Sequence, residues 1–498
     1  MSYKVDLSDL DREGAASLTA QMVERFSAAI DAGSLAPGEK LRTTRALAET
    51  AGVNHLTAVR VYRRLSELGY VTATVGRGTF VRTVPPARAG DGVEWQRSVL
   101  PRLPPSYPNE MLAASLHMPS DPRIVSLATG WPSPDLYPTP ELARLTAEIF
   151  DELGGEALAY SEPDGLPILR EELAKRGLHH GYATDADEIL VTSGGRQGID
   201  LACRTIVAPG DVVVCESPTF IGTLSSLQAT GARVIGVPVD EDGMDVDALE
   251  RVLARHEVKL VALQGSSHNP TGQDLSEERA ARLIDLARER SFFVLEDGVY
   301  ATVRFDRPER RRLRERAPEH VIYIDSLSKT IGGGLRLGWM AAAGPVRSRL
   351  GALKMQTDLH TSSLVQRLAQ RYLASGHHEE LLERTNPIYA ERAEHMLDSV
   401  ARRLGDDARA MRPHGGHHLW VTFDRPLDER QLWGEAMRQG VGFTPGGATL
   451  AEPSGRASVR LSFCYLEPEM LDEGIRRLAA AVRAVRRREG MPSLAAFS

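Results

Sequence analysis

The spacing of apolar residues predicts three helices and a hairpin at the start of the chain. Residues 18–32, about 44–50 and about 57–68 repeat apolar positions every three or four residues, as amphipathic helices do. Residues 70–81 then carry two short apolar runs around a glycine-rich turn, which predicts a hairpin. Together these elements predict a winged helix-turn-helix over residues 10–83, a fold whose third helix enters the major groove of DNA.

The third of these helices has one apolar side and one charged side. The apolar side is formed by Ala58, Val61, Tyr62, Leu65 and Leu68. The opposite side carries Arg60, Arg63, Arg64 and Glu67. We therefore expect the apolar side to pack on the first two helices and the arginines to face outward.

A different pattern begins near residue 124, where short apolar runs rich in β-branched residues alternate with helical stretches. The runs are Glu188–Val191, Val212–Cys215, Val234–Val237, Leu260–Leu263, Phe292–Leu295 and Val321–Ile324. Such alternation predicts βα units and a mostly parallel sheet that helices cover on both faces. We expect a large α/β domain over residues 124–346 and a smaller α+β domain over residues 347–490.

Prolines separate the two patterns. Eight of them lie between Pro85 and Pro122, and proline removes a backbone donor and fixes φ, so neither a helix nor a central strand is expected there. Residues 84–123 therefore read as a semi-rigid linker.

Composition and charge narrow the class of protein. With 498 residues, 42% hydrophobic and 26% charged, the chain is long enough for roughly three folded units, and no apolar run approaches the roughly 18 residues that span a bilayer. The chain has three cysteines, at positions 203, 215 and 464. Their odd number and wide separation exclude a disulfide framework, and their spacing is not that of a metal site. We expect a cytoplasmic protein without membrane contact and without a bound metal.

The charge is unevenly distributed along the chain. The whole chain has a net charge of −7, yet residues 40–82 contain 8 basic and only 2 acidic residues. A small basic module on an acidic body is what we expect if only the N-terminal part meets nucleic acid.

The N-terminal segments resemble the GntR-type winged helix over about 65 residues, through AIDAGSLAPGEKL, TTRALAETAGV, TAVRVYRRLSELGYV and GRGTFV. The resemblance implies binding to double-stranded promoter DNA. This sequence departs from the family pattern twice, with Arg42 in place of the usual proline and Asn54-His55 in place of Ser-Arg. The residues that we expect to contact DNA are Arg45, His55, Thr57, Arg60, Arg64, Gly76 and Gly78.

Five polar motifs lie where predicted parallel strands end, which is where open α/β sheets bind ligands. They are Thr192–Gln197, Glu216–Phe220, His268–Gly272, Glu296–Tyr300 and Ser326–Lys329, the last followed by Arg336. A lysine, a glycine-rich turn before a helix, an aromatic ring and an acid together meet the needs of pyridoxal 5′-phosphate (PLP).

These motifs, in this order, resemble the fold-type I aminotransferases of the aspartate aminotransferase class over residues 125–490. The resemblance implies that Lys329 forms an aldimine with PLP and acts as the catalytic residue. It implies that Asp297 pairs with the pyridine nitrogen, and that Asn269 and Tyr300 bond the ring hydroxyl oxygen. Phe220 would stack on the ring.

The same resemblance assigns the phosphate and the ligands beyond the ring. The phosphate would be held by Gly195, Arg196, Ser326, Ser328 and Arg336. Tyr160 matches a tyrosine that reaches the phosphate of the neighbouring subunit, and Arg460 matches the arginine that pairs with the substrate α-carboxylate. Structural roles are expected for the histidines at 268, 377, 378, 417 and 418, and a solvated loop for the six arginines of residues 307–316.

A GntR-type winged helix followed by a linker and an aminotransferase-like domain resembles the MocR/GabR family of transcriptional regulators over the whole chain. That family implies a head-to-tail homodimer in which PLP, or a small amino compound that forms an aldimine with it, changes the affinity for an operator. The alternative is an active PLP-dependent aminotransferase that retains a winged helix, because no expected catalytic position is missing.

Overall fold

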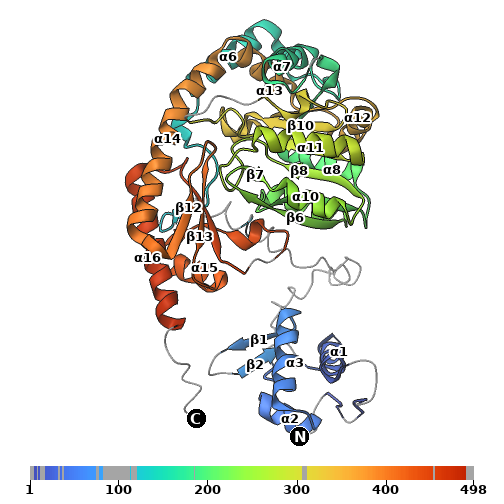
Figure 1. Cartoon of the computed structure of the whole chain (residues 1–498), viewed down its shortest axis with the longest axis vertical. Coiled ribbons are helices and arrows are strands. Elements are labelled where there is room, and N and C mark those ends of the chain that lie inside the picture. The colour runs from blue at the N-terminus through green and yellow to red at the C-terminus, as the bar shows by residue number, and fades with distance from the viewer. Residues whose placement is uncertain are drawn as a thin grey trace. The chain divides into compact units, whose positions relative to one another are not determined.

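In a computed structural model, the chain folds into two compact units, Met1–Pro104 and Pro105–Ser498 (Figure 1). The described residues are 5–7, 9–11, 17–31, 34–35, 39–74, 78–81, 111, 113, 121–183, 185–305, 311–452 and 455–489. Most of the linker expected over residues 84–123 lies outside them, and so does Gly76.

The N-terminal unit is the expected winged helix-turn-helix. Its elements are α1 (Leu18–Asp31), α2 (Thr44–Ala51), α3 (His55–Glu67), β1 (Val71–Thr74) and β2 (Gly78–Val81). The turn between α2 and α3 is built by local signals: Gly52 ends α2 in the left-handed region at φ 60°, and the Asn54 side chain accepts from the Leu56 N–H at 2.9 Å. β1 and β2 pair antiparallel.

The two sides of α3 match the sequence pattern with one exception. Ala58, Val61, Tyr62 and Leu65 are buried, together with residues of α1 and α2. Arg60, Arg63 and Arg64 are exposed. The burial expected for Leu68 is wrong: it is 47% exposed, because α3 ends at Glu67 and Leu68 caps it instead of continuing its apolar side.

The C-terminal unit is built on one eight-stranded sheet. Its strands, in spatial order, are β4 (Ile189–Thr192), β11 (Gly338–Ala341), β10 (Val321–Ser326), β9 (Phe293–Asp297), β8 (Val258–Leu263), β5 (Val212–Ser217), β6 (Arg233–Asp240) and β7 (Gly243–Met244). The run from β10 to β6 is parallel, as expected. β11 was not expected; it lies antiparallel between β10 and β4, and its sequence Gly-Trp-Met-Ala lacks the β-branched residues that mark the other strands.

Helices cover both faces of this sheet. The side chains of its strands therefore point alternately into two hydrophobic cores, one on each face. Val213 and Leu260 pack in one cluster, while Val214 and Val261 pack in another. The helices around the sheet are α6 (Thr139–Leu153), α7 (Pro167–His180), α8 (Gly195–Ile206), α9 (Ile221–Ala229), α10 (Val246–Leu253), α11 (Glu277–Arg290), α12 (Pro345–Asp358) and α13 (Ser363–Ala374). The fold class is therefore the expected doubly covered α/β sheet.

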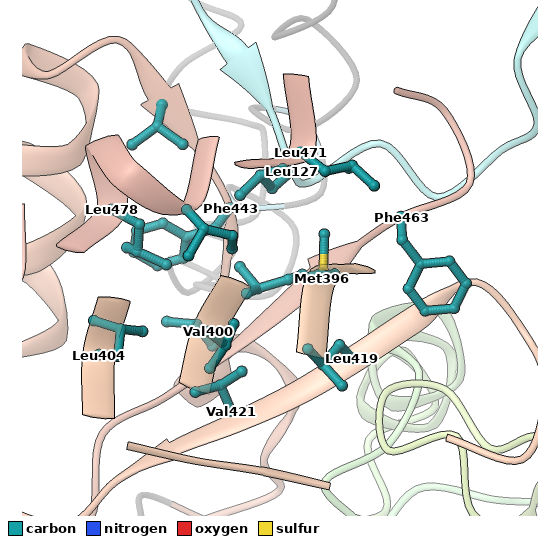
Figure 2. Packing of buried hydrophobic residues seen from close by; sticks show 14 of the residues in the cluster. Leu127, Met396, Val400, Leu404, Leu419, Val421, Phe443, Phe463, Leu471 and Leu478 are labelled. Carbon is teal, nitrogen blue, oxygen red and sulfur yellow. The ribbon is translucent and has the colours of Figure 1, made fainter. Parts of the chain in front are cut away.

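A second, smaller sheet has the order β12 (Ala408–Met411), β13 (His418–Phe423), β16 (Ser458–Ser462) and β15 (Thr444–Pro445). It packs with α14 (His377–Leu404), α15 (Glu429–Arg438) and α16 (Pro468–Glu489). Figure 2 shows their shared core, in which Met396 and Val400 of α14 lie near Leu419 and Val421 of β13.

The packing crosses the border that we expected at residues 346/347. Leu350 of α12 and Leu368 of α13 pack into the cores of the large sheet. Conversely, β3 (Val125–Ser126) pairs with β14 (Val441–Gly442) and Leu127 joins the core of the small sheet. The chain thus enters the C-terminal unit on the side of its smaller sheet.

The arginine-rich stretch of residues 307–316 corrects a second expectation. Its described part contains Arg312 and Arg314, which are each only 2% exposed. The Arg312 Nε donates to the Tyr323 hydroxyl at 3.0 Å, and the Arg314 guanidinium pairs with Glu188 at 3.1 Å. Tyr323 is 11 residues from Arg312 and Glu188 is 126 residues from Arg314, and the composition of the stretch shows neither contact, so it suggested a solvated loop. Within the described part of the chain, no helix is both long and apolar enough to cross a bilayer.

Candidate functional site

A cavity of about 200 Å³ opens where the parallel strands of the large sheet end. It is lined by Gly195, Arg196, Ile199, Phe220, Gln264, Asn269, Asp297, Val299, Tyr300, Ser326, Ser328, Lys329 and Arg336. Every residue that the sequence assigned to cofactor binding is among them, apart from Tyr160. The sequence pattern therefore located the cavity, while the role of each residue stays a prediction.

One end of the cavity is shaped to hold an anion. After β4 the chain turns at Gly194 and α8 begins at Gly195, so the first N–H groups of this helix have no partner within it. Gly194 has φ 104°, and a Cβ at this position would lie 2.8 Å from Nη2 of Arg336. The turn therefore requires glycine, and it allows Arg336 Nη2 to donate to the Ser193 carbonyl at 2.8 Å.

This turn is held in place by a network that the sequence did not reveal. The Ser193 hydroxyl and the Gln197 amide donate to Oδ2 of Asp358 at 3.1 and 2.7 Å. Lys354, whose side chain is fully buried, bonds Oδ1 of Asp358 at 2.9 Å. Partial burial raises the pKa of Asp358, but the hydrogen bonds from Lys354 and Gln197 outweigh that effect and hold the pKa below its usual value.

A buried acid also lines the cavity. Asp297 is the last residue of β9; its Oδ2 accepts from Nε2 of Gln264 at 2.9 Å and its Oδ1 accepts from the Val299 N–H at 3.1 Å. Burial raises the pKa of Asp297 to about 6, so the carboxylate is still ionised at neutral pH. Gln264 also accepts from the Asn269 N–H at 2.7 Å. It was missed although its place directly after β8 could have marked it.

Lys329 lies in the short helix after β10 and reaches across the cavity. Its Nζ donates to the Gly130 carbonyl at 2.8 Å and lies 5.6 Å from the centre of the Tyr300 ring. Burial lowers the pKa of Lys329 to about 8, with Arg460 and Arg336 acting in the same direction. A depressed pKa gives this amine a neutral, nucleophilic fraction near pH 7.

Two of the histidines expected to be structural, His417 and His418, pack edge-on against Tyr300, which lines the cavity. The Tyr300 hydroxyl and Nε2 of His418 are 3.0 Å apart, and Nδ1 of His418 lies 2.9 Å from the Ser462 hydroxyl. Burial and nearby cations hold the pKa of His418 well below its usual value, so its ring is neutral. Burial also lowers the pKa of His417 to about 3. His418 therefore orients the Tyr300 hydroxyl, which sequence spacing could not indicate.

Arg460 is a buried cation beside the cavity. It lies in the middle of β16, is 7% exposed, and donates to the Ala128 carbonyl and the Thr444 hydroxyl, both at 3.0 Å, and to the Asn269 side chain at 3.3 Å. It forms no ion pair with any residue that the structure describes, and its Nε lacks a hydrogen-bond partner there. A buried guanidinium without a carboxylate leaves a favourable position for an anionic ligand.

Tyr160 lies away from the cavity. Its side chain is 84% exposed and its ring meets that of His360 edge-on at 5.3 Å. Its predicted contact with the phosphate of a neighbouring subunit stays a prediction.

In the N-terminal unit, the residues expected to contact DNA lie on an open surface. Arg45, Arg60 and Arg64 are exposed, and Thr57 is half-buried. The His55 ring bonds the Thr44 hydroxyl at 3.0 Å, which links α3 to α2. Gly78 has φ 113° and a Cβ there would lie 2.8 Å from Lys40, so this hairpin position requires glycine.

Comparison with known families matches both units. Residues 122–478 match the family "Aminotransferase class I and II", whose members depend on PLP, and residues 18–81 match "Bacterial regulatory proteins, gntR family". The chain is 34% identical to the 2-aminoadipate transaminase of Thermus thermophilus over 74% of this chain and 93% of that protein. The crystal structure of LysN, an alpha-aminoadipate aminotransferase from the same species, superposes with a TM-score of 0.71 at 33% identity, covering 76% of this chain and 95% of LysN.

Other relatives share both units. The chain is 30% identical to the uncharacterized HTH-type transcriptional regulator YisV of Bacillus subtilis, over 91% of this chain and 93% of YisV. It is 26% identical to the probable rhizopine catabolism regulatory protein MocR of Rhizobium meliloti, over 97% of each chain. The chain therefore belongs to the MocR-type transcriptional regulators, in which a GntR-type DNA-binding winged helix is fused to a domain of the aminotransferase class I and II family.

Proposed function

We propose that the cavity binds PLP, that Lys329 attaches to it covalently, and that an amino compound reaching this site changes the affinity of the winged helix for its operator. The observation that carries the proposal is the convergence of Lys329, Asp297 and the N-terminus of α8 on one cavity beside the unpaired Arg460. When bound, PLP supplies an electron-withdrawing ring whose aldehyde reacts with primary amines.

The residues present fit PLP at three points. The first N–H groups of α8, which have no partner within the helix, and the side chain of Arg336 suit a phosphate, and the φ of 104° at Gly194 favours glycine in the turn that presents them. Asp297, ionised and held by Gln264, suits a protonated pyridine nitrogen. Phe220 also lines the cavity and would cover one face of the ring.

The proposed effector carries a primary amine and an anionic group. The amine would take the place of the Lys329 amine, and the anion would pair with Arg460, whose present partners are all neutral oxygen acceptors. We further propose a head-to-tail homodimer, in which the exposed Tyr160 reaches the partner's phosphate site, and a cytoplasmic location, where a regulator meets promoter DNA.

An amine panel tests this proposal on the full-length protein. Each amine is added to the PLP-loaded protein while the visible absorption spectrum and the mobility of a promoter duplex are recorded on the same sample. We expect amino acids to change both readouts together, and simple alkylamines to change neither at the same concentration. A spectral change without any change in DNA mobility for every amine tested would contradict the sensor function.

The second candidate is a working aminotransferase. It is supported by the intact cavity and by the 34% identity to a 2-aminoadipate transaminase. Release of keto acid in amounts well above one equivalent per chain, with an amino donor and a keto-acid acceptor both present, would establish turnover. Release limited to one equivalent would favour sensing.

A further inference from the structure

We propose that Leu56 reads the C5-methyl group of a thymine in the major groove, so that the operator carries a thymine opposite the first turn of α3. The proposal rests on the DNA-binding function of the winged helix, and it adds the kind of base that this chain recognises. It assigns a specificity role to an exposed apolar residue of the recognition helix.

The position of Leu56 on α3 is the first observation. The buried side of the helix is formed by Ala58, Val61, Tyr62 and Leu65. At about 100° per residue, Leu56 points about 10° from the direction opposite that side. It lies in the first turn, where recognition helices contact base edges, and the bond between the Asn54 side chain and its own N–H fixes where this turn begins.

Its exposure is the second observation. The Leu56 residue is 63% exposed, and Val59, one turn further along, is 39% exposed. A single exposed leucine is common on protein surfaces, but here it stands at the centre of the outward side, with Arg60 and Arg63 exposed next to it. Burying this side chain in a groove would add apolar contact that the free protein lacks.

The chemistry of the neighbouring residues selects the partner. Arginines on the same side supply contacts to phosphates and to guanine, while the first turn of α3 has no acidic residue to repel DNA. The His55 ring bonds Thr44 and so lies along α2. Among the four bases, thymine alone presents a methyl group in the major groove, and aliphatic side chains contact it there.

Uracil substitution isolates that methyl group. The full-length protein is first used to select high-affinity duplexes from a pool with a randomised 20-bp core. Each thymine of a selected duplex is then replaced in turn by deoxyuridine, which differs only by the missing methyl. At one position per bound winged helix we expect the dissociation constant to rise about fourfold. This ratio corresponds to about 0.8 kcal/mol, the free energy of burying one group of methylene size.

The variant Leu56→Ala should bind the thymine and the uracil duplex with equal affinity. Leu68→Ala is the matched control, since Leu68 is also an exposed leucine at 47% but caps the far end of α3; it should keep the fourfold ratio. Because both side chains are exposed, equal unfolding temperatures are expected for all three proteins.

The outcomes separate the two levels of the proposal. A protein that binds duplexes but shows no thymine-to-uracil ratio at any position overturns the role of Leu56 alone. An unchanged ratio in Leu56→Ala overturns it as well. A protein that binds no duplex at all overturns the DNA-binding function, and the role of Leu56 falls with it.

Discussion

The cavity of the C-terminal unit is assembled from residues at five different strand ends, several of them buried, whereas the proposed DNA-contact surface of the N-terminal unit lies mainly on one exposed helix. In the cavity, Asp297, Lys329 and Arg460 each hold a defined hydrogen-bond partner. On α3, Arg60 and Arg64 stand exposed at the surface. A buried polar group that loses its partner costs much more than an exposed one.

The difference teaches how function should respond to substitution in each unit. In the cavity, one replacement should abolish or strongly weaken ligand binding, because each group makes a contact that no neighbouring group repeats. On the DNA surface, single replacements should act weakly and add up, because phosphate contacts are similar and separate.

Replacing Lys329 should give the largest effect. In Lys329→Ala the amine that we propose attaches PLP is absent, so the visible absorption band that borohydride reduction removes should be lost completely. The control is Lys259→Ala, which removes an exposed lysine that pairs with Glu257. A borohydride-reducible band that persists in Lys329→Ala would place the attachment at another residue.

Replacing Arg460 should weaken the effector at least tenfold. Loss of one partner of a buried charge pair costs roughly 2–5 kcal/mol, so Arg460→Ala should raise the dissociation constant of an amino acid effector while PLP binding is largely kept. The spectral titration and the DNA shift are measured together. Arg409→Ala, at an arginine whose side chain is 82% exposed on β12, should change nothing; an equal loss in both variants would contradict the anion-binding role.

The DNA surface should respond in a graded way. The double variant Arg45→Ala/Arg64→Ala should bind promoter duplexes about tenfold more weakly, and the slope of log affinity against log salt should fall by about 2, one unit per phosphate contact. The double variant Arg144→Ala/Arg204→Ala removes the same charge from exposed positions of the C-terminal unit and should bind normally. An unchanged slope in the first variant would move the contact surface elsewhere.

Variants of Asp358 should distinguish its effect on PLP binding from its effect on the stability of the fold. Asp358→Asn leaves Lys354 buried without a carboxylate, so we expect unfolding to become about 3 kcal/mol easier and PLP to bind several-fold more weakly. In Lys354→Met/Asp358→Asn the buried cation is gone and stability should return. If Asp358 positions the anion-binding turn, PLP affinity stays low in the double variant; full recovery of affinity would show a purely structural role.

The pH dependence of PLP attachment should reveal the depressed pKa of Lys329. Only the neutral amine reacts, so the rate should rise with pH through a midpoint of about 8 instead of near the ordinary value of about 10.4. The lowered pKa means that the proton leaves at lower pH, which places the rise between about pH 7 and 9. Stopped-flow absorbance across this range measures it, and a midpoint above 10 would contradict the burial of the amine.

The features that the sequence predicted correctly are those that depend on residues close together in the chain. Apolar runs marked six strands of the large sheet, and the polar residues directly after five of them marked the cavity, because strand ends meet at one edge of a parallel sheet. The start of α3 was predicted two residues late, at about Thr57, because the cap that the Asn54 side chain provides begins the helix at His55.

Contacts between distant segments could not be predicted in this way. Asp358 meets Ser193 across 165 residues, and His418 meets Tyr300 across 118. Arg314 looked like a surface residue until its partner Glu188, 126 residues away, was placed beside it. β11 was missed since four residues without a β-branched side chain carry no strand signal of their own.

The main chain that follows β3 accepts hydrogen bonds from both cations of the site. Lys329 donates to the carbonyl of Gly130 and Arg460 to that of Ala128, and this same main chain leads upstream to the linker of the winged helix. A ligand that paired with Lys329 or Arg460 would compete with the hydrogen bond from that side chain to this stretch. This stretch follows β3 directly and so lies near the start of the C-terminal unit in sequence, which makes its carbonyl groups the place to look for a first structural response to a bound ligand.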